Sequence, residues 1–339
     1  VYLLYCRRRE NRLAISSLEF EKGGAKMKKI AFIYNSVPDD NRKGLLVECA
    51  ASTTVVAIEH ALIQGGNEII PINLRSPGQL AKVFAEGGKP DYALVIAEGF
   101  LDQPSTLFNG SGAALVRQTL TELGVPFSHS SVVAMELCRH KEQTYRILQE
   151  QGISCPWHVF LTESDVPNIP QWWFPLFVKP SGGGNSIGID EGSLVYSPRQ
   201  LARRIEAVTR MLGPVGFVAE QYLPGSEYTV GVLGGEAPVV LPAVAFGAKV
   251  RSLSAKRREG KGKAQIILPQ EPLYFQMQDM ALKTFFALGC ADVIRIDIKA
   301  DSTGRLYIID VNGTPSLAPA ASLSQMAAAA GLEYGEFVN

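Results

Sequence analysis

Between Lys28 and about Pro126, apolar strand-like runs alternate with helical patterns, and this alternation constrains the fold more than any other feature. The first run, KIAFIYN, precedes a helical stretch, VECAASTTVVAIEHALIQ, that ends at Gly65-Gly66, a common kind of helix terminator. The runs NEIIPINL, DYALVIAEG and VPFSH continue the alternation. This pattern predicts a parallel sheet covered by helices on both faces. No G-x-G-x-x-G follows the first strand, so a dinucleotide site lacks its usual support.

The composition excludes several classes of protein. The chain has 339 residues, enough for two or three domains, and its 33 basic and 33 acidic side chains give a net charge of zero. That balance argues against nucleic-acid or membrane-surface partners, and no apolar run approaches the roughly 20 residues of a membrane span. Five scattered cysteines favour reduced thiols in a cytoplasmic protein over a disulfide framework.

The segment before the first strand is unlike a signal peptide, because its apolar residues precede its basic ones in VYLLYCRRRENR. We expect residues 1–26 to be an extension outside the fold and Met27 to be the start. A chain beginning at Met27 should then fold and act normally.

Downstream of residue 130 the pattern changes from strand–helix alternation to antiparallel strands. Two short helices, the strand PLFVKP, a glycine-rich segment and the helix SPRQLARRIEAVTRML come first. GFVAEQYL, EYTVGVLG and APVVLPAVAF read as further strands, interrupted by a basic, glycine-containing loop at 250–264. A helix near 272–288 and a final helix at SLSQMAAAAGL flank the last two strands.

Those two strands, in RIDIKADSTGRLYIIDVNGTP, carry polar groups on one face. Side chains two apart in a strand share a face, so Arg295 lies beside Asp297, and Asp310 lies beside Asn312. If ADSTGR is the hairpin turn, the two polar faces coincide. Carboxylate and amide oxygens are hard ligands suited to Mg²⁺ that also binds substrate phosphates. The alternative is a solvated sheet face with incidental ion pairs.

The glycine-rich segment FVKPSGGGNSIGI is a candidate phosphate site. Lys179 ends an apolar strand, and three consecutive glycines let backbone N–H groups approach an anion. It is not a P-loop, because no Gly-Lys-Ser/Thr follows. A flexible turn is the alternative.

Two further segments are ambiguous by themselves. AEQYLPGSEYTVGVL can offer backbone groups to an adenine edge and a carboxylate to ribose hydroxyls, or it can be a plain hairpin. Lys141 lies on an amphipathic helix, where a lysine is usually just solvated. No H-E-x-x-H occurs, so a metal-dependent hydrolase has little support.

Taken together and in this order, these segments resemble the ATP-grasp superfamily and, within it, the D-alanine–D-alanine ligases. The resemblance implies an α/β fold in three parts with ATP between the last two. These are an N-terminal parallel α/β domain at 27–129, a small central α+β subdomain at 130–222, and a C-terminal ATP-grasp α+β subdomain with the metal site at 223–339.

The resemblance also implies roles for individual residues. Lys141 and Lys179 match the lysines that contact ATP phosphates, and Arg295 matches the arginine that steadies the transferred phosphoryl group, so Arg295 and Lys179 are expected to be catalytic. The nucleotide-binding expectations are completed by Gly183, Gly184, Ser186, Glu220, Gln221, Leu223 and, for ribose, Glu227. Asp297, Asp310 and Asn312 match the ligands of Mg²⁺ or Mn²⁺, although the family more often has Glu at position 310.

The amino-acid half of the site departs from the family pattern. The family's loop serine corresponds to Asn185 and its mobile-loop tyrosine to Arg257, while Lys256 matches the neighbouring loop lysine and is expected to be catalytic. Ser316 falls at an acceptor-site position, so Asn185, Arg257 and Ser316 are the expected substrate contacts. The N-terminal glutamate has only a loose counterpart in Glu48. The family's His-Gly segment reads EGF from Glu98.

The resulting prediction is an ATP- and Mg²⁺-dependent, ADP-forming carbon–nitrogen ligase that makes a dipeptide or related amide through an acyl phosphate. Its amino-acid specificity is expected to differ from that of the family, toward a larger or more acidic pair, unless the basic loop at 250–264 is only a solvated lid. The alternatives are an authentic D-alanine–D-alanine ligase and a catalytically inactive nucleotide-binding regulator. The expected partners are small carboxylates and amines, with no nucleic acid or membrane, and a homodimer is the family expectation.

Overall fold

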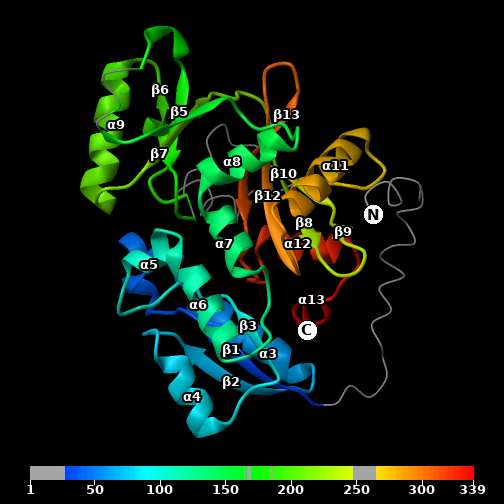
Figure 1. The fold of residues 1–339 in the computed structure, drawn as a ribbon. Coiled ribbons are helices and arrows are strands. Elements are labelled where there is room, and N and C mark those ends of the chain that lie inside the picture. The colour runs from blue at the N-terminus through cyan, green and yellow to red at the C-terminus, as the bar shows by residue number, and fades with distance from the viewer. Residues whose placement is uncertain (1–26, 164, 166–168, 185, 247–264) are drawn as a thin grey trace.

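The described part of the chain forms three β-sheets (Figure 1). The structure is a computed structural model that describes residues 27–163, 165, 169–184, 186–246 and 265–339. Within that part of the chain, none of the helices combines the length and apolar character that a membrane span requires.

The N-terminal sheet is parallel, with the strand order β2-β1-β3. Its strands are β1 (Lys29–Tyr34), β2 (Glu68–Asn73) and β3 (Tyr92–Val95), and its helices include α3 (Ser52–Gln64), α4 (Gln79–Gly87), α5 (Ser105–Phe108) and α6 (Ser111–Glu122). Alternate residues of β1 pack against α3 on one face and against α4 and α6 on the other. Helices therefore cover both faces, as the strand–helix alternation predicts.

Two local expectations in this domain are wrong. The run VPFSH is not a strand, because only Phe127 forms a bridge, with Ala93 of β3. The first helix begins at Ser52 rather than near Val47, since Gly44–Glu48 forms a 3-10 turn and the chain is extended at Cys49.

The central sheet is antiparallel, with the order β4-β7-β5-β6. It comprises β4 (His158–Leu161), β5 (Leu176–Pro180), β6 (Leu194–Val195) and β7 (Phe217–Gln221), and α9 (Pro198–Leu212) packs on it. The α9 helix starts where Ser197 accepts a hydrogen bond from the Gln200 N–H, with Pro198 at the first helical position. This sheet carries Lys179 and Glu220 toward the rest of the molecule.

The largest sheet has the order β11-β10-β8-β12-β13, with β9 also paired to β8. Its strands are β8 (Glu227–Leu233), β9 (Val239–Val240), β10 (Ala243–Phe246), β11 (Gln265–Ile267), β12 (Val293–Ala300) and β13 (Leu306–Asn312). The expected continuous strand APVVLPAVAF is split, because Leu241-Pro242 separates β9 from β10. α7 (Val132–Arg139), α8 (Lys141–Glu150) and α11 (Pro272–Ala287) share a core with this sheet.

The chain's C-terminal helices join the first and last parts of the fold. α12 (Ser322–Ala329) and α13 (Tyr334–Val338) pack in one apolar cluster with β1, α3 and β10, so that Phe32 and Val244 share a core with Met326. This common core fixes the N-terminal sheet against the sheet that carries the polar hairpin.

Candidate active site

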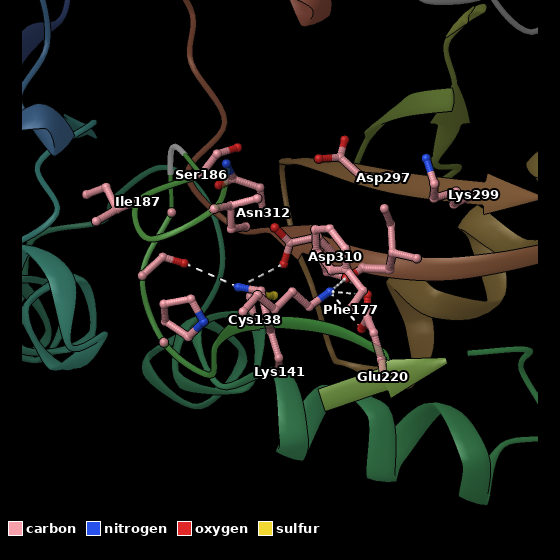
Figure 2. Close-up of a pocket in the computed structure, with 18 of the residues that line it drawn as sticks. Cys138, Lys141, Phe177, Ser186, Ile187, Glu220, Asp297, Lys299, Asp310 and Asn312 are labelled. Carbon is pink, nitrogen blue, oxygen red and sulfur yellow. Dashed lines mark hydrogen bonds and ion pairs between the residues drawn. The ribbon is translucent and has the colours of Figure 1, made fainter. Parts of the chain in front are cut away.

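A cleft of about 1070 Å³, including its open mouth, lies between the central sheet and the largest sheet (Figure 2). Residues from β5, β7, β12, β13, α7 and the start of α8 line it, together with the glycine-rich loop after β5. The cleft lining includes most of the residues singled out in the sequence: Lys141, Lys179, Gly183, Gly184, Ser186, Glu220, Gln221, Leu223, Glu227, Arg295, Asp297, Asp310 and Asn312.

The β12–β13 hairpin brings its polar residues directly opposite one another. Asp297 is paired with Asp310, and Arg295 is paired with Asn312, across the antiparallel ladder. β12 ends at Ala300 and β13 begins at Leu306, so the turn lies where it was predicted. Like charges directly opposite in a sheet destabilise it, so this arrangement requires cations beside the two carboxylates.

Arg295 supplies one of those cations. Its Nε lies 3.1 Å from Asp297 Oδ1 and its Nη2 lies 3.2 Å from Oδ2, a bidentate pair. The Thr229 hydroxyl, on β8, also donates to Asp297 Oδ1 at 2.6 Å. Burial is the largest single influence on the Arg295 guanidinium and lowers its pKa, but the carboxylates of Asp297, Asp310 and Glu227 together outweigh burial, so this pKa lies above its ordinary value. Arg295 is a fixed positive charge at the cleft wall.

Lys141 supplies the second cation. Its Nζ lies 3.3 Å from Asp310 Oδ1 and 3.3 Å from the carbonyl oxygen of Gly183 (Figure 2). The side chain is almost fully buried although it begins a helix, so it is not simply solvated. Asn312 Oδ1 accepts from the Thr314 N–H at 3.0 Å, which orients the amide at the end of β13.

Lys179 sits at the centre of a buried network. Its Nζ lies 2.8 Å from Glu220 Oε2, 3.0 Å from the Tyr145 hydroxyl and 2.8 Å from the Ile309 carbonyl. The Tyr145 hydroxyl has two acceptors within hydrogen-bond reach, Glu220 Oε2 at 2.7 Å and the Ile309 carbonyl at 2.8 Å, and its single proton can be donated to either one. Burial, reinforced by the charge of Glu220, raises the pKa of Tyr145 well above its ordinary value, so the phenol stays neutral. The network holds the lysine in one place at the cleft wall.

One glycine of the glycine-rich loop, Gly183, is required for steric reasons. Gly183 has φ +83°, and a Cβ there would lie 2.3 Å from the Phe108 ring. Ser186 also takes a positive φ, 58°. The Gly184 N–H donates to Glu48 Oε1 at 2.9 Å, so Glu48, only loosely aligned in sequence, does reach the loop. Gly184 is thus held by a hydrogen bond to the N-terminal domain.

The segment expected to contact adenine and ribose begins at the end of β7. The Gln221 N–H bonds to the Trp157 carbonyl at 2.8 Å, and Leu223 is buried at the cleft. Glu227, the first residue of β8, lies 3.2 Å from Lys299 Nζ.

One expected site residue lies away from the cleft, and three fall in parts of the chain that the structure does not describe. Asn185, Lys256 and Arg257 lie outside the described residues. Ser316 is exposed beyond the cleft lining, which ends at Gly313, and its hydroxyl accepts from the Ala318 N–H at 3.3 Å.

Three residues of this region were missed in the sequence. Lys299 could have been found, because it continues the two-residue period of Arg295 and Asp297 on β12. Arg139, which lines the cleft and forms a buried ion pair with Glu98, carries no sequence signal, since its partner is 41 residues away on another domain. Tyr145 reads only as part of an amphipathic helix.

The oxygen ligands at the hairpin suit a Mg²⁺ ion that also binds phosphates. They suit less well a metal ion held by protein ligands alone. Among the described residues no group of three or more His, Cys, Asp or Glu side chains could hold a metal ion. Two carboxylates and one amide oxygen on one strand pair leave coordination positions open, and Mg²⁺ commonly fills such positions with water and substrate phosphate oxygens.

Comparison with known proteins decides the family. The family model described as "D-ala D-ala ligase C-terminus" matches residues 147–339. A D-alanine–D-alanine ligase of Syntrophotalea carbinolica is 30% identical over 288 residues, covering 83% of this chain and 87% of that protein. The chain belongs to the D-alanine–D-alanine ligase family.

Other relatives agree. The D-alanine–D-alanine ligase A of Bacillus cereus is 27% identical over 276 residues, covering 80% of this chain and 85% of its own length. A crystal structure of the Bacillus anthracis ligase complexed with ATP superposes with a TM-score of 0.69 at 23% identity, covering 92% of this chain and 94% of that one. The ATP-grasp fold and the class of ATP-dependent, ADP-forming carbon–nitrogen ligase are thus confirmed.

Proposed function

We propose that this member of the D-alanine–D-alanine ligase family joins a carboxylate and an amine into a dipeptide or related amide through an acyl phosphate. The observation that carries the proposal is the pairing of Asp297 with Asp310 and of Arg295 with Asn312 on one cleft wall. Lys141 approaches this pairing from the glycine-rich side. A surface with these charges suits triphosphate oxygens and a divalent cation.

In the proposed complex, ATP lies along the cleft from β7 to the glycine-rich loop. The Gln221–Leu223 segment would contact the adenine edge, and Glu227 would accept hydrogen bonds from ribose hydroxyls. Lys141 and Lys179 would contact the phosphates, together with the Gly183–Gly184 backbone and Ser186. Their burial in the free protein means that little side-chain freedom is lost when the nucleotide binds.

Asp297, Asp310 and Asn312 would hold Mg²⁺, or Mn²⁺, between the hairpin and the phosphates. Bound there, the cation would supply charge neutralisation on the triphosphate. Arg295 and Lys141, which offset the two carboxylates in the free protein, would then be able to share their positive charge with phosphate oxygens.

The chemistry proceeds in two steps. An oxygen of the substrate carboxylate attacks the γ-phosphorus of ATP, and the bond to the bridging oxygen breaks with release of ADP. The amine nitrogen of the second substrate then attacks the acyl carbon, loses a proton, and expels inorganic phosphate. Arg295 and Lys179 contribute by fixed positive charge beside the transferred phosphoryl group, which costs no reorganisation during the reaction.

We also propose that the amino-acid pair differs from the D-alanine named for the relatives. The family's loop serine and tyrosine are Asn185 and Arg257 in this sequence, and Arg139, which is paired with Glu98, lines the cleft. A buried site that has lost the polar partners of one substrate rejects that substrate strongly. Lys256 and Arg257 would then meet the substrate directly.

The contact between Glu48 and Gly184 favours the second candidate, an authentic D-alanine–D-alanine ligase, since it retains an N-terminal glutamate at the loop. For either candidate we propose small-molecule partners, a cytoplasmic location and a homodimer.

The test is phosphate release from Mg·ATP across D- and L-amino acids, offered singly and in pairs, with the amide product identified by mass spectrometry. Release with D-alanine alone would support the authentic ligase, and release with another pair would support altered specificity. If no amino acid releases phosphate while ATP still binds, the ligase proposal fails in favour of an inactive nucleotide-binding protein.

A further inference from the structure

Lys299 is a buried cation in the cleft to which none of the expected roles applies. It lies on the same face of β12 as Asp297 (Figure 2) and Arg295, is 9% exposed and lines the cleft, as Glu227 does. Strand register places Lys299 directly opposite Glu227 of β8, and its Nζ lies 3.2 Å from Glu227 Oε2. The Lys299 ammonium, a donor, and the Glu227 carboxylate, an acceptor, therefore lie next to each other at the cleft wall.

The backbone around this pair is fixed. The Gly225 N–H bonds to the Ala300 carbonyl at 2.9 Å, and the Ala300 N–H bonds to the Ser226 carbonyl at 2.9 Å. A Cβ at Gly225 would lie 2.6 Å from the Ala300 oxygen, so the segment before β8 approaches the end of β12 more closely than another residue would permit. This close approach determines where Glu227 and Lys299 enter the cleft.

Burying the ion pair of Lys299 with Glu227 costs desolvation free energy, which suggests a function other than stabilising the fold. Removing two charges from water costs several kcal/mol per ion, and apolar side chains of similar volume often stabilise a fold at least as well. An ion pair at a cleft wall instead offers both a hydrogen-bond acceptor and a donor to a ligand. Glu227 alone could only accept, and Lys299 alone could only donate.

We infer that Lys299 and Glu227 together recognise the two adjacent hydroxyls of a nucleotide ribose, with Glu227 accepting from one and Lys299 donating to the oxygen of the other. This inference rests on the proposed function, in which ATP occupies the cleft. Lys299 lies two residues from Asp297, about 6–7 Å along the strand, on the side away from Arg295. It therefore faces the sugar end of the nucleotide rather than the transferred phosphoryl group.

The inference is tested by calorimetric titration of the whole protein with Mg·ADP and Mg·2′,3′-dideoxy-ADP. The unaltered protein should bind the dideoxy nucleotide at least about tenfold more weakly, because the hydrogen bonds from the two hydroxyls to these charged side chains are lost. Lys299→Met should weaken the binding of ADP about tenfold but change the binding of dideoxy-ADP little. The preference of the protein for ADP over dideoxy-ADP should therefore become smaller. Lys283→Met, which removes an exposed lysine of α11, is the matched control and should behave as the unaltered protein.

Other outcomes overturn the inference. If Lys299→Met weakens the binding of ADP and of dideoxy-ADP equally, Lys299 contacts a phosphate. If it weakens the binding of neither nucleotide, the ion pair is purely structural. If Lys299→Met does not fold, Lys299→Arg and the double variant Lys299→Met/Glu227→Gln replace it. Lys299→Arg should retain discrimination, whereas the double variant should lose it. Failure of the unaltered protein to bind either nucleotide would refute the proposed function itself.

Discussion

Replacing Asp297 with asparagine removes one negative charge from the polar hairpin while preserving side-chain volume. In the structure this carboxylate accepts two bonds from Arg295 and one from Thr229, at 3.1, 3.2 and 2.6 Å. Asparagine has one oxygen and an NH₂ group, so at least one bond to Arg295 is lost and a donor faces the guanidinium. Hydrogen bonds to charged groups contribute about 1.5–3 kcal/mol each.

The larger effect is expected on catalysis. Loss of a preorganised electrostatic contact typically costs about 3–4 kcal/mol in the transition state, which corresponds to about 10²–10³ in kcat. Because the amide is a poorer Mg²⁺ ligand, the Mg²⁺ concentration for half-maximal rate should also rise. Thr229→Val is the matched control: it removes one hydrogen bond from the same carboxylate but keeps its charge, so kcat should fall about tenfold at most.

The assay is steady-state phosphate release at saturating ATP, measured as Mg²⁺ is varied, with the amino-acid pair found in the substrate panel. Circular dichroism and thermal unfolding check that each variant is folded. If Asp297→Asn keeps kcat within about twofold of the unaltered protein and shows the same Mg²⁺ dependence, the assigned role is wrong.

Three further predictions concern Lys179, Asp310 and the buried His129. Lys179→Met leaves Glu220 buried without its cation and should lower the free energy of unfolding in urea by about 3–5 kcal/mol. The double variant Lys179→Met/Glu220→Gln should regain most of that stability but should not regain ATP affinity. A Lys179→Met variant as stable as the unaltered protein would contradict this. Asp310→Glu, with its longer side chain, should lower the half-saturating Mg²⁺ concentration, and an unchanged or higher value would count against Asp310 as a ligand. Burial, aided by nearby positive charge, lowers the pKa of His129 to about 3, below its unfolded value near 6.5, so protons bind the unfolded state first and stability is lost as pH falls from 6.5 toward 3. The free energy of unfolding should therefore fall by about 2 kcal/mol between pH 6.5 and 5 because of His129. In the His129→Asn variant, whose asparagine tolerates the positive φ there, the free energy of unfolding from urea titrations should depend less steeply on pH. An unchanged pH dependence would refute the assignment.

The parts of the site that could be predicted are those encoded locally. The polar hairpin follows from a two-residue period on either side of a turn, and the register of Asp297 with Asp310 agrees with it. The same rule, carried one step further, would have included Lys299. The VPFSH run shows the limit of local patterns. Its residues are typical of a strand, but only Phe127 forms a β-bridge, with Ala93.

The parts that could not be predicted depend on contacts between distant segments. Phe32 packs in one cluster with Val244 and Met326, more than 200 residues away along the chain, and no periodicity encodes that contact. The buried pair of Glu98 with Arg139 likewise exists only once the N-terminal domain has packed against α7. Such pairs are set by the packing of whole domains.

The most direct measurement is a crystal structure of the protein with ADP and Mg²⁺, with Mn²⁺ substituted to identify the cation by its anomalous signal. We expect the cation about 2.0–2.1 Å from oxygens of Asp297, Asp310 and Asn312 in the Mg²⁺ crystal, and also bound to an ADP phosphate. A cation bound elsewhere, or ADP bound with its phosphates away from the β12–β13 hairpin, would contradict the account.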